Sequence, residues 1–270
     1  MLSRKEEIER SIITKFRKDI WRKFTKAVRD YQLIKDGDKI AVCISGGKDS
    51  MLLAKCMEEL RKHGKANFEI CYIVMNPGYR SDVYEKIVDN AKVLGIDIKV
   101  FKSNIFEIVD KQVASPCYLC ARMRRGFLYA RAQELGCNKI ALGHHFDDVI
   151  ETIMLSILYG GEYKSMPPKL KSTNFEGMEL IRPLYLVREK SIKKWSEYNN
   201  LEFINCACKF TNSNSYSSKR NEVKKLISDL EKNYSNIAAN IFKSSENVNV
   251  ETVLGIKKDN QKISFLDYYN

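Results

Sequence analysis

Short apolar runs alternate with longer helical patterns through the middle of this chain. The runs lie at about residues 39–45, 68–75, 97–101 and 138–143. Helical patterns are expected at about 50–63, 81–94, 119–135 and 147–159. Parallel strands need a crossover, which is usually a helix, so this alternation predicts an α/β fold with a doubly wound, mostly parallel sheet. Such sheets bind ligands at the carboxyl ends of their strands.

Helical segments flank the alternating region. They are expected at about 3–33, 188–200, 219–231 and 234–246. The predicted organisation is an N-terminal helical arm at 1–35, a central α/β domain at 36–205 and a C-terminal helical extension at 206–270. Ser81 is expected to cap the helix at 81–94, and Gly95 to end it. The polar stretch 211–220 is predicted to be a loop, because Ser and Asn favour turns.

The chain is strongly basic, with a net charge of +12 and a pI of about 9.2. Basic residues recur along its whole length, which favours an acidic partner, and nucleic acid ahead of a membrane. A solvated basic surface is the alternative explanation. No apolar run is long enough to span a bilayer, and the N-terminal segment lacks the apolar core of a signal peptide. We therefore expect a cytoplasmic protein with no membrane partner.

A glycine pair lies between the first apolar run and the first helix, in the stretch "CISGGKDSMLL" at 43–53. Glycines let the backbone turn with its N–H groups inward, and the start of the following helix attracts an anion. Serine hydroxyls and a lysine ammonium add further donors. The expected phosphate-binding residues are Ser45, Gly46, Gly47, Lys48, Asp49 and Ser50.

This loop differs from the common P-loop, which requires Gly where Val42 stands and Ser or Thr where Asp49 stands. A carboxylate beside phosphates is repelled unless a cation lies between them. Asp49 therefore indicates a phosphate site that also binds Mg²⁺. The charge of Lys48 is expected to stabilise a departing pyrophosphate.

The stretch "GHHFDDVIET" at 143–152 follows the fourth apolar run and should face the same crevice. Asp147 and Asp148 fall in the first turn of the next helix, where carboxylates either contact a metal or substrate or cap the helix. His144 and His145 are adjacent, so they cannot share a helix face as a zinc pair does. One of them either lines the nucleotide pocket or packs structurally.

The spacing of the eight cysteines separates two groups. Cys117 and Cys120 form a Cys-x-x-Cys motif before a helix, which is ligand spacing for zinc or an iron–sulfur cluster, with a redox pair as the alternative. A distant thiolate from Cys206 or Cys208 would complete a three-cysteine site. Three thiolates on a four-iron cluster leave one iron for exogenous sulfur. The cysteines expected to be structural are Cys43, Cys56, Cys71 and Cys137.

Arginines follow the Cys-x-x-Cys motif on the same predicted helix. Arg122, Arg124 and Arg125 are expected to contact RNA phosphates, and an ATP phosphate is the alternative partner of Arg124. The N-terminal arm is also rich in Lys and Arg, where a solvated helix face explains the pattern equally well. Its apolar positions indicate that one side of the arm is buried, in a dimer or on the core.

The Ser-Gly-Gly-Lys-Asp-Ser loop resembles the PP-loop of the ATP pyrophosphatase superfamily. Three stretches together resemble the TtcA family of tRNA cytidine 2-thiolating enzymes. They are "CISGGKDSMLL", "PCYLCARMRRGFLYARAQELGCNKIALGHHFDDVIETIMLSILYGGEYKSMPPKL" and "IRPLYLVREKSI", spread over about residues 38–195. The Cys-x-x-Cys motif running into "RRG", and "YGG…MPPKL" before "IRPL", are more specific to that family than the PP-loop.

The resemblance implies a Rossmann-like PP-loop fold, also called the adenine nucleotide alpha hydrolase fold, and a homodimeric, tRNA-binding enzyme. It implies that ATP adenylates the C2 carbonyl of a cytidine in the anticodon loop and that sulfur then replaces the oxygen. The implied cofactors and partners are ATP, Mg²⁺, a [4Fe–4S] cluster held by three cysteines, tRNA, and a sulfur donor system such as a cysteine desulfurase.

Site residues carry over from the resemblance position by position. Ser45, Gly46, Gly47, Asp49 and Ser50 match the PP-loop. From the residues themselves, catalytic roles are expected for Lys48, Asp49 and Asp147, and nucleotide contacts for Gly143 and His144 as well as the loop. Cys117 and Cys120 match the first two cluster ligands. The family pattern Pro-Cys-x-x-Cys-Gly is replaced here by Asn205-Cys206-Ala207-Cys208-Lys209. Cys206 is therefore the expected third ligand, with Cys208 as the alternative.

Two other function classes are compatible with the same residues. One is another PP-loop tRNA modifier, either a 2-thiouridine synthetase with similar ligands or a lysidine-type ligase, which would not need the cysteines. The other is a non-catalytic, metal-stabilised RNA-binding protein that senses ATP without turnover.

Overall fold

The computed structural model describes residues 2–110, 116–204, 215–259, 261–267 and 269, without the side chains of 110, 116–118 and 215–218. The chain divides into two compact units. The first comprises Met1–Val149 and Pro167–Ser218, and the second comprises Ile150–Met166 and Lys219–Asn270. Among the described residues, no helix is both long enough and apolar enough to cross a bilayer. The domain boundaries expected from the sequence remain a prediction.

A six-stranded sheet with the order β3-β2-β1-β4-β6-β5 organises the first unit. The strands are β1 (Lys39–Ile44), β2 (Glu69–Asn76), β3 (Ile98–Lys102), β4 (Lys139–Ala141), β5 (Lys169–Lys171) and β6 (Glu179–Ile181). All neighbouring strands are parallel except β5 and β6. The predicted α/β fold with a mostly parallel sheet is confirmed, and the four expected strands are β1 to β4.

Strand β1 lies in the interior of the sheet because its side chains are apolar on both faces. Ala41 and Cys43 belong to the core cluster on one face, and Val42 and Ile44 to the cluster on the other. Val42 pairs with Tyr72 of β2 on one side and with Ala141 of β4 on the other. The chain order reverses between β1 and β4, which is the point where open α/β sheets bind their ligands.

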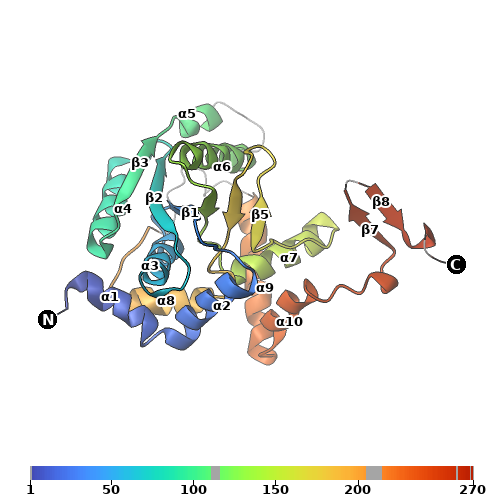
Figure 1. Ribbon diagram of the computed structural model, residues 1–270. Coiled ribbons are helices and arrows are strands. Elements are labelled where there is room, and N and C mark those ends of the chain that lie inside the picture. The colour runs from blue at the N-terminus through green and yellow to red at the C-terminus, as the bar shows by residue number, and fades with distance from the viewer. Residues whose placement is uncertain (1, 111–115, 205–214, 260, 268, 270) are drawn as a thin grey trace. The chain divides into compact units, whose positions relative to one another are not determined.

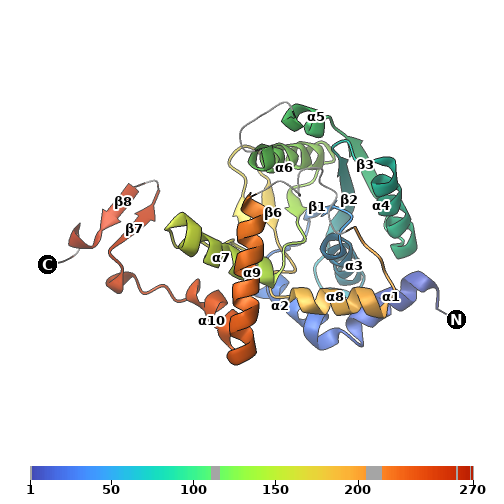
Figure 2. The same cartoon turned by 180° about the vertical axis from the view of Figure 1, so that it is seen from behind.

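Helices cover both faces of this sheet (Figures 1 and 2). Helix α6 (Pro116–Glu134) packs on β1, β2 and β4 from one side, and α3 (Lys48–His63) packs on β1 and β2 from the other. Helices α4 (Ser81–Leu94) and α8 (Glu189–Tyr198) lie beside α3. The unit also contains α5 (Ile105–Asp110) and the start of α7 (Phe146–Gly160).

One predicted cap was wrong. The N-cap of α4 is Arg80, and Ser81 is the first helical residue. Arg80 instead holds the first turn through an ion pair with the exposed carboxylate of Asp82. Gly95 ends the helix as predicted, in the left-handed conformation (φ +63°) that favours glycine.

The N-terminal arm belongs to the same core as the sheet. It consists of α1 (Arg4–Ile13), a π-helical turn (Arg17–Trp21) and α2 (Arg22–Asp30). Ile8, Ile12, Ile20 and Phe24 are fully buried in the cluster that contains the α3 side chains. The predicted buried side of the arm is confirmed and faces the core of the unit, while Lys and Arg side chains cover the exposed side.

A buried charge cluster fixes the arm to α3. The Lys55 side chain is 0% exposed, and its Nζ lies 2.5 Å from both Glu9 Oε1 and Glu58 Oε2. The same ammonium donates to Leu94 O at 2.9 Å, while Lys62 pairs with Glu9 Oε2 at 2.9 Å. Burial raises the pKa of Glu9, but hydrogen bonds from Lys55 and Lys62 outweigh it and hold the pKa below its usual value. Each carboxylate of the cluster therefore lies beside an ammonium group.

The second unit contains the rest of α7, most of α9 (Ser215–Asn233), α10 (Ile237–Ser244) and a hairpin of β7 (Gly255–Lys258) and β8 (Gln261–Ser264). Within it, Arg220 Nε donates to Glu151 Oε2 at 2.7 Å, and Tyr159 Oη donates to Glu222 Oε2 at 2.7 Å. Figure 2 shows α9 and α10. The loop predicted at 211–220 is wrong for residues 215–220, which begin α9, and residues 211–214 lie outside the described part.

Candidate active site

The glycine pair forms a tight turn between β1 and α3. Gly46 has φ +86°, and a Cβ at that position would lie 2.6 Å from Ile87 Cγ1, so both backbone and space require glycine. The N-cap of α3 is Gly47, which offers no side chain to the first N–H groups of the helix. These N–H groups are therefore available to an anion.

Two serine hydroxyls shape the loop. Ser50 Oγ accepts from Ser45 N at 3.1 Å and donates to Gly47 O at 2.9 Å. Ser45 Oγ lies 3.1 Å from the same Ser50 oxygen. Ser50 thus ties the end of β1 to the first turn of α3, and its predicted contact with phosphate remains a prediction.

Charged groups at the start of α3 are only partly paired. Lys48 Nζ lies 3.2 Å from Asp49 Oδ2 and 3.0 Å from Glu189 Oε1. Burial lowers the pKa of Lys48, but the two carboxylates outweigh burial and raise it, so the ammonium stays charged. Asp49 Oδ1 is buried and accepts no hydrogen bond from the residues that the structure describes. A carboxylate oxygen without a hydrogen bond, beside an anion-binding loop, has the chemistry of a Mg²⁺ ligand.

The "GHH" segment passes closely over the start of α3. A Cβ on Gly143 would lie 3.0 Å from both Asp49 C and Ser50 N, so only glycine allows this approach. The His145 side chain is 7% exposed, and its Nε2 lies 3.8 Å from Asp49 Oδ1. The segment after β4 and the loop after β1 therefore form one site, as expected from their places in the sheet.

Asp147 and Asp148 of this segment each accept a hydrogen bond from a backbone N–H at the start of a helix. Asp148 Oδ2 accepts from His145 N at 2.9 Å, and Asp148 N donates to His145 Nδ1 at 3.3 Å, which caps α7. Asp147 Oδ1 accepts from Arg188 Nε at 3.0 Å, and its Oδ2 accepts from Glu189 N at 2.6 Å. Both Asp147 oxygens thus join α7 to α8, which favours the structural alternative, and its catalytic role remains a prediction.

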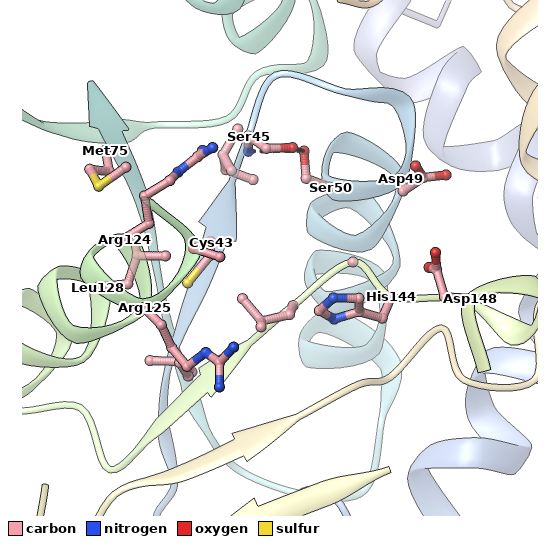
Figure 3. A pocket seen from close by; sticks show the side chains of 15 residues that line it. Cys43, Ser45, Asp49, Ser50, Met75, Arg124, Arg125, Leu128, His144 and Asp148 are labelled. Carbon is pink, nitrogen blue, oxygen red and sulfur yellow. Dashed lines mark hydrogen bonds between the residues drawn. The ribbon is translucent and has the colours of Figure 1, made fainter. Parts of the chain in front are cut away.

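These groups surround a cavity of about 410 Å³ (Figure 3). The loop contributes Ser45, Asp49 and Ser50, and α6 contributes Arg124 and Arg125 from the opposite wall. Arg124 Nη2 donates to Tyr79 Oη at 3.1 Å. The remaining lining residues are Cys43, Ile44, Met75, Ala121, Leu128, Ile140, Leu142, Gly143, His144 and Asp148. The cavity combines an anion-binding loop, an unpaired carboxylate oxygen and two guanidinium groups.

Comparison with known proteins shows which family this chain belongs to. The family of the PP-loop domain matches residues 16–230. The tRNA-cytidine(32) 2-sulfurtransferase of Vibrio cholerae serotype O1 (strain O395) is 38% identical over 240 residues, which cover 87% of this chain and 75% of that protein. The protein of the same name from Vibrio vulnificus (strain YJ016) is 36% identical over 240 residues, which again cover 87% of this chain and 75% of that protein.

The chain belongs to the tRNA-cytidine(32) 2-sulfurtransferase family. Its PP-loop domain implies ATP binding. The solved structure of the U34-tRNA thiolase NcsA from Methanococcus maripaludis, with its [4Fe–4S] cluster, is also similar. That structure has a TM-score of 0.64 and 25% identity, and the match covers 92% of this chain and 81% of that one.

The cysteines implied by this sulfurtransferase family lie only partly within the described residues. Cys120 is 5% exposed and packs with Met75, Phe106 and Val109 on one side of α6. Cys117 lies in the first turn of α6, where side chains are not described, and Cys206 and Cys208 lie outside the described residues. In the described part, no three His, Cys, Asp or Glu side chains gather as a metal site would require. The three-cysteine site remains a prediction.

Sequence reasoning did not find several residues of this sulfurtransferase site. Arg188 and Glu189 reach the PP-loop region from α8, and the only sequence signal was a charged pair at the start of a predicted helix. Ile204 also contacts the loop. Its N–H donates to Gly46 O at 3.4 Å, and its Cδ1 lies 3.1 Å from the position of a Gly46 Cβ.

Proposed function

We propose that this chain is an ATP-dependent tRNA sulfurtransferase that places sulfur on C2 of an anticodon-loop cytidine. The observation that carries the proposal is the position of α6. This helix contains the Cys-x-x-Cys motif and forms one wall of the PP-loop cavity, to which it contributes Arg124 and Arg125. Nucleotide and cysteine chemistry therefore share one helix.

The reaction begins with activation of a poor electrophile. The C2 carbonyl oxygen of cytidine attacks the α-phosphorus of ATP, the bond to the β-phosphate oxygen breaks, and pyrophosphate leaves. A sulfur nucleophile then attacks C2, and AMP departs with the former carbonyl oxygen. The N–H groups of the loop and Arg124, which lines the cavity, stabilise the negative charge that develops on the leaving pyrophosphate. Lys48, whose ammonium lies between Asp49 and Glu189 at the start of α3, adds its charge.

Two further groups fit this chemistry. The unpaired Asp49 oxygen fits Mg²⁺, which would neutralise charge between the phosphates. Cys117, Cys120 and either Cys206 or Cys208 would hold a [4Fe–4S] cluster, which supplies an open iron for exogenous sulfur. Buried Cys120 has an apolar environment, as a cluster site requires.

Partners follow from the same proposal. The substrate is tRNA, and the sulfur donor is a system such as a cysteine desulfurase. We also propose a homodimer and a cytoplasmic location. The exposed Arg122 and Arg125 of α6 would contact RNA phosphates near the cavity.

The test is anaerobic purification of wild type and of the Cys117→Ala, Cys206→Ala and Cys208→Ala variants. About four irons with matching sulfide are expected in wild type. The cluster should be lost in Cys117→Ala and in one of the other two. Cys71→Ala serves as the control, since Cys71 lies near the start of β2, away from α3 and its loop.

The same samples are then incubated with tRNA, ATP and sulfide, and the nucleosides are identified by mass spectrometry. Formation of 2-thiocytidine supports the proposal. Iron-free protein with full activity, or ATP binding without pyrophosphate release, would overturn it in favour of a ligase or an ATP-sensing RNA-binding protein.

A second candidate is thiolation of uridine. The similarity to the archaeal U34-tRNA thiolase extends over 92% of this chain, so the fold alone does not separate the two bases. The nucleoside analysis separates them, because 2-thiouridine and 2-thiocytidine differ in mass.

A further inference from the structure

A second cavity adjoins the PP-loop cavity. It has a volume of about 440 Å³ and lies between α6 and the segment that joins β5 to β6, all within the first unit. Ala121 and Arg125 line both cavities. We call the second cavity the α6 groove. Its side walls include Arg122, Arg125, Tyr129, Leu170, Lys171 and Phe175.

One wall of the α6 groove is aromatic and apolar. The rings of Tyr129 and Phe175 stack with centroids 5.2 Å apart and an interplanar angle of 12°. Leu170 of the edge strand β5 is 48% exposed beside them. A wall of this kind binds flat, weakly polar groups such as nucleobases.

The other wall is cationic. Arg122, Arg125 and Lys171 are exposed. None of the three forms an ion pair with a carboxylate among the residues that the structure describes. Cations that gather without ion-pair partners favour a polyanionic ligand.

A buried guanidinium lies behind this wall. Arg182 is 8% exposed, its Nη1 donates to Pro167 O, and its Nε has no hydrogen-bond partner in the part of the chain that the structure describes. Burial, together with nearby Arg125, lowers the pKa of Arg182 to about 10, so it remains charged at neutral pH. A buried cation without a paired carboxylate is costly, and an anion bound near Arg125 would compensate it.

We propose that the α6 groove binds the nucleotide that adjoins the target base in the substrate RNA. The neighbouring base packs on Phe175 and Leu170, with the buried ring of Tyr129 supporting Phe175, and the phosphate that links the two nucleotides lies against Arg125, which faces both cavities. The proposal rests on the proposed function for the identity of the ligand as RNA. Unstacked bases held on aromatic side chains, with phosphates on arginines, are the usual features of single-stranded RNA recognition.

The first test measures binding of an anticodon stem–loop RNA with a cytidine in its loop. Phe175→Ala should raise the Kd for this RNA about tenfold, through loss of stacking. Arg122→Ala should weaken binding and reduce the slope of log K against log salt by about 0.7 to 1. ATP affinity should stay unchanged in both, since neither residue lines the PP-loop cavity.

Arg61→Ala is the matched control for charge. Arg61 is exposed in the last turn of α3, at the end opposite the PP-loop, and lines neither cavity. It should leave the salt slope and the RNA affinity unchanged. Unfolding curves for all variants show whether a binding change reflects loss of folded protein.

The second test replaces the loop nucleotide beside the cytidine with 5-iodouridine and maps photo-crosslinks by mass spectrometry. A crosslink to the peptide containing Tyr129 or Phe175 is expected. Crosslinks confined to other segments, or wild-type affinity and salt slope in both variants, would overturn the groove proposal. If the groove variants weaken RNA binding but wild type forms no thiolated cytidine, the groove stands and the proposed function fails. If wild type thiolates and both variants bind RNA normally, the reverse holds.

Discussion

Charged groups at the start and in the middle of helix α3 differ in how completely they are paired. In its middle, Lys55 is 0% exposed and saturated by Glu9, Glu58 and a backbone carbonyl. At its start, Asp49 has one buried oxygen without a hydrogen-bond partner among the described residues, and the helix has no side-chain cap.

The difference separates charges that stabilise the fold from charges that bind a ligand. A saturated cluster gains its stability from partners within the chain, so any loss appears in the free energy of unfolding. An unsaturated site leaves its hydrogen-bonding capacity for an incoming group, so any loss appears in binding or rate. The following variants test this contrast.

Lys55→Ala should have the largest effect, a loss of about 3–5 kcal/mol of unfolding free energy, because Glu9 and Glu58 would remain buried without their ammonium. Urea unfolding measures it. Lys62→Ala is the control, since the Lys62 side chain is 35% exposed and the same carboxylates keep Lys55. That control should lose less than about 1 kcal/mol. Equal losses would show that the buried pairing is not what matters.

Asp49→Asn should reduce pyrophosphate release in the presence of tRNA by about 10²–10³-fold, through loss of a carboxylate oxygen for the metal. Its unfolding free energy should change by less than about 0.5 kcal/mol. Measuring both quantities on one preparation separates binding from folding. A large loss of stability with near-normal activity would contradict the contrast between the start and the middle of α3.

Gly143→Ala should cost about 1–3 kcal/mol of unfolding free energy, because the new Cβ would press on the Asp49 and Ser50 backbone. ATP affinity should fall with it, since the PP-loop must shift. Gly126→Ala in α6 is the control, because a Cβ there meets nothing within 4 Å. It should raise stability by about 0.5–1 kcal/mol. Calorimetry of unfolding and of ATP binding tests both.

The smallest expected effect is on the pH dependence of the unfolding free energy, and it comes from Asp38. Burial raises its pKa, but hydrogen bonds from Lys139, Asn138 and the Lys35 N–H outweigh burial and lower it. The stabilisation is therefore present above the unfolded-state pKa of about 3.9 and is lost as the pH falls through the lower folded-state pKa. The difference in unfolding free energy between wild type and Asp38→Asn should shrink between pH 6 and pH 3. A constant difference would contradict this assignment.

Local patterns made much of the fold predictable. The run "KIAVCI" is apolar on both faces and is the interior strand β1, and Gly95 ends α4 at the expected residue. Strand β4 also has three residues, but it lies within the longer apolar run at 138–143. Strands β5 and β6, with the sequences KLK and ELI, lie in no run that the sequence marked as a strand. Residues 215–220 are helical despite their Ser and Asn content, because composition is a weak guide where packing decides.

The site was predictable where one continuous segment forms it. The PP-loop residues and the "GHH" segment lie together, as their positions after β1 and β4 require. Arg188 and Glu189 come from a distant helix, and no short-range pattern connects them to Asp147 or Lys48. Long-range contacts of this kind depend on tertiary packing, which a single sequence does not display.

The contact between Ile204 and Gly46 couples the turn after β1 to a residue far along the chain. Gly46 belongs to the turn that receives phosphate, and Ile204 stands two positions before Cys206 in the sequence. A displacement of Gly46 would therefore also displace Ile204, through one backbone hydrogen bond and one isoleucine side chain. Under the proposed function, binding of ATP at the turn would be felt at Ile204, the last described residue before the predicted third ligand.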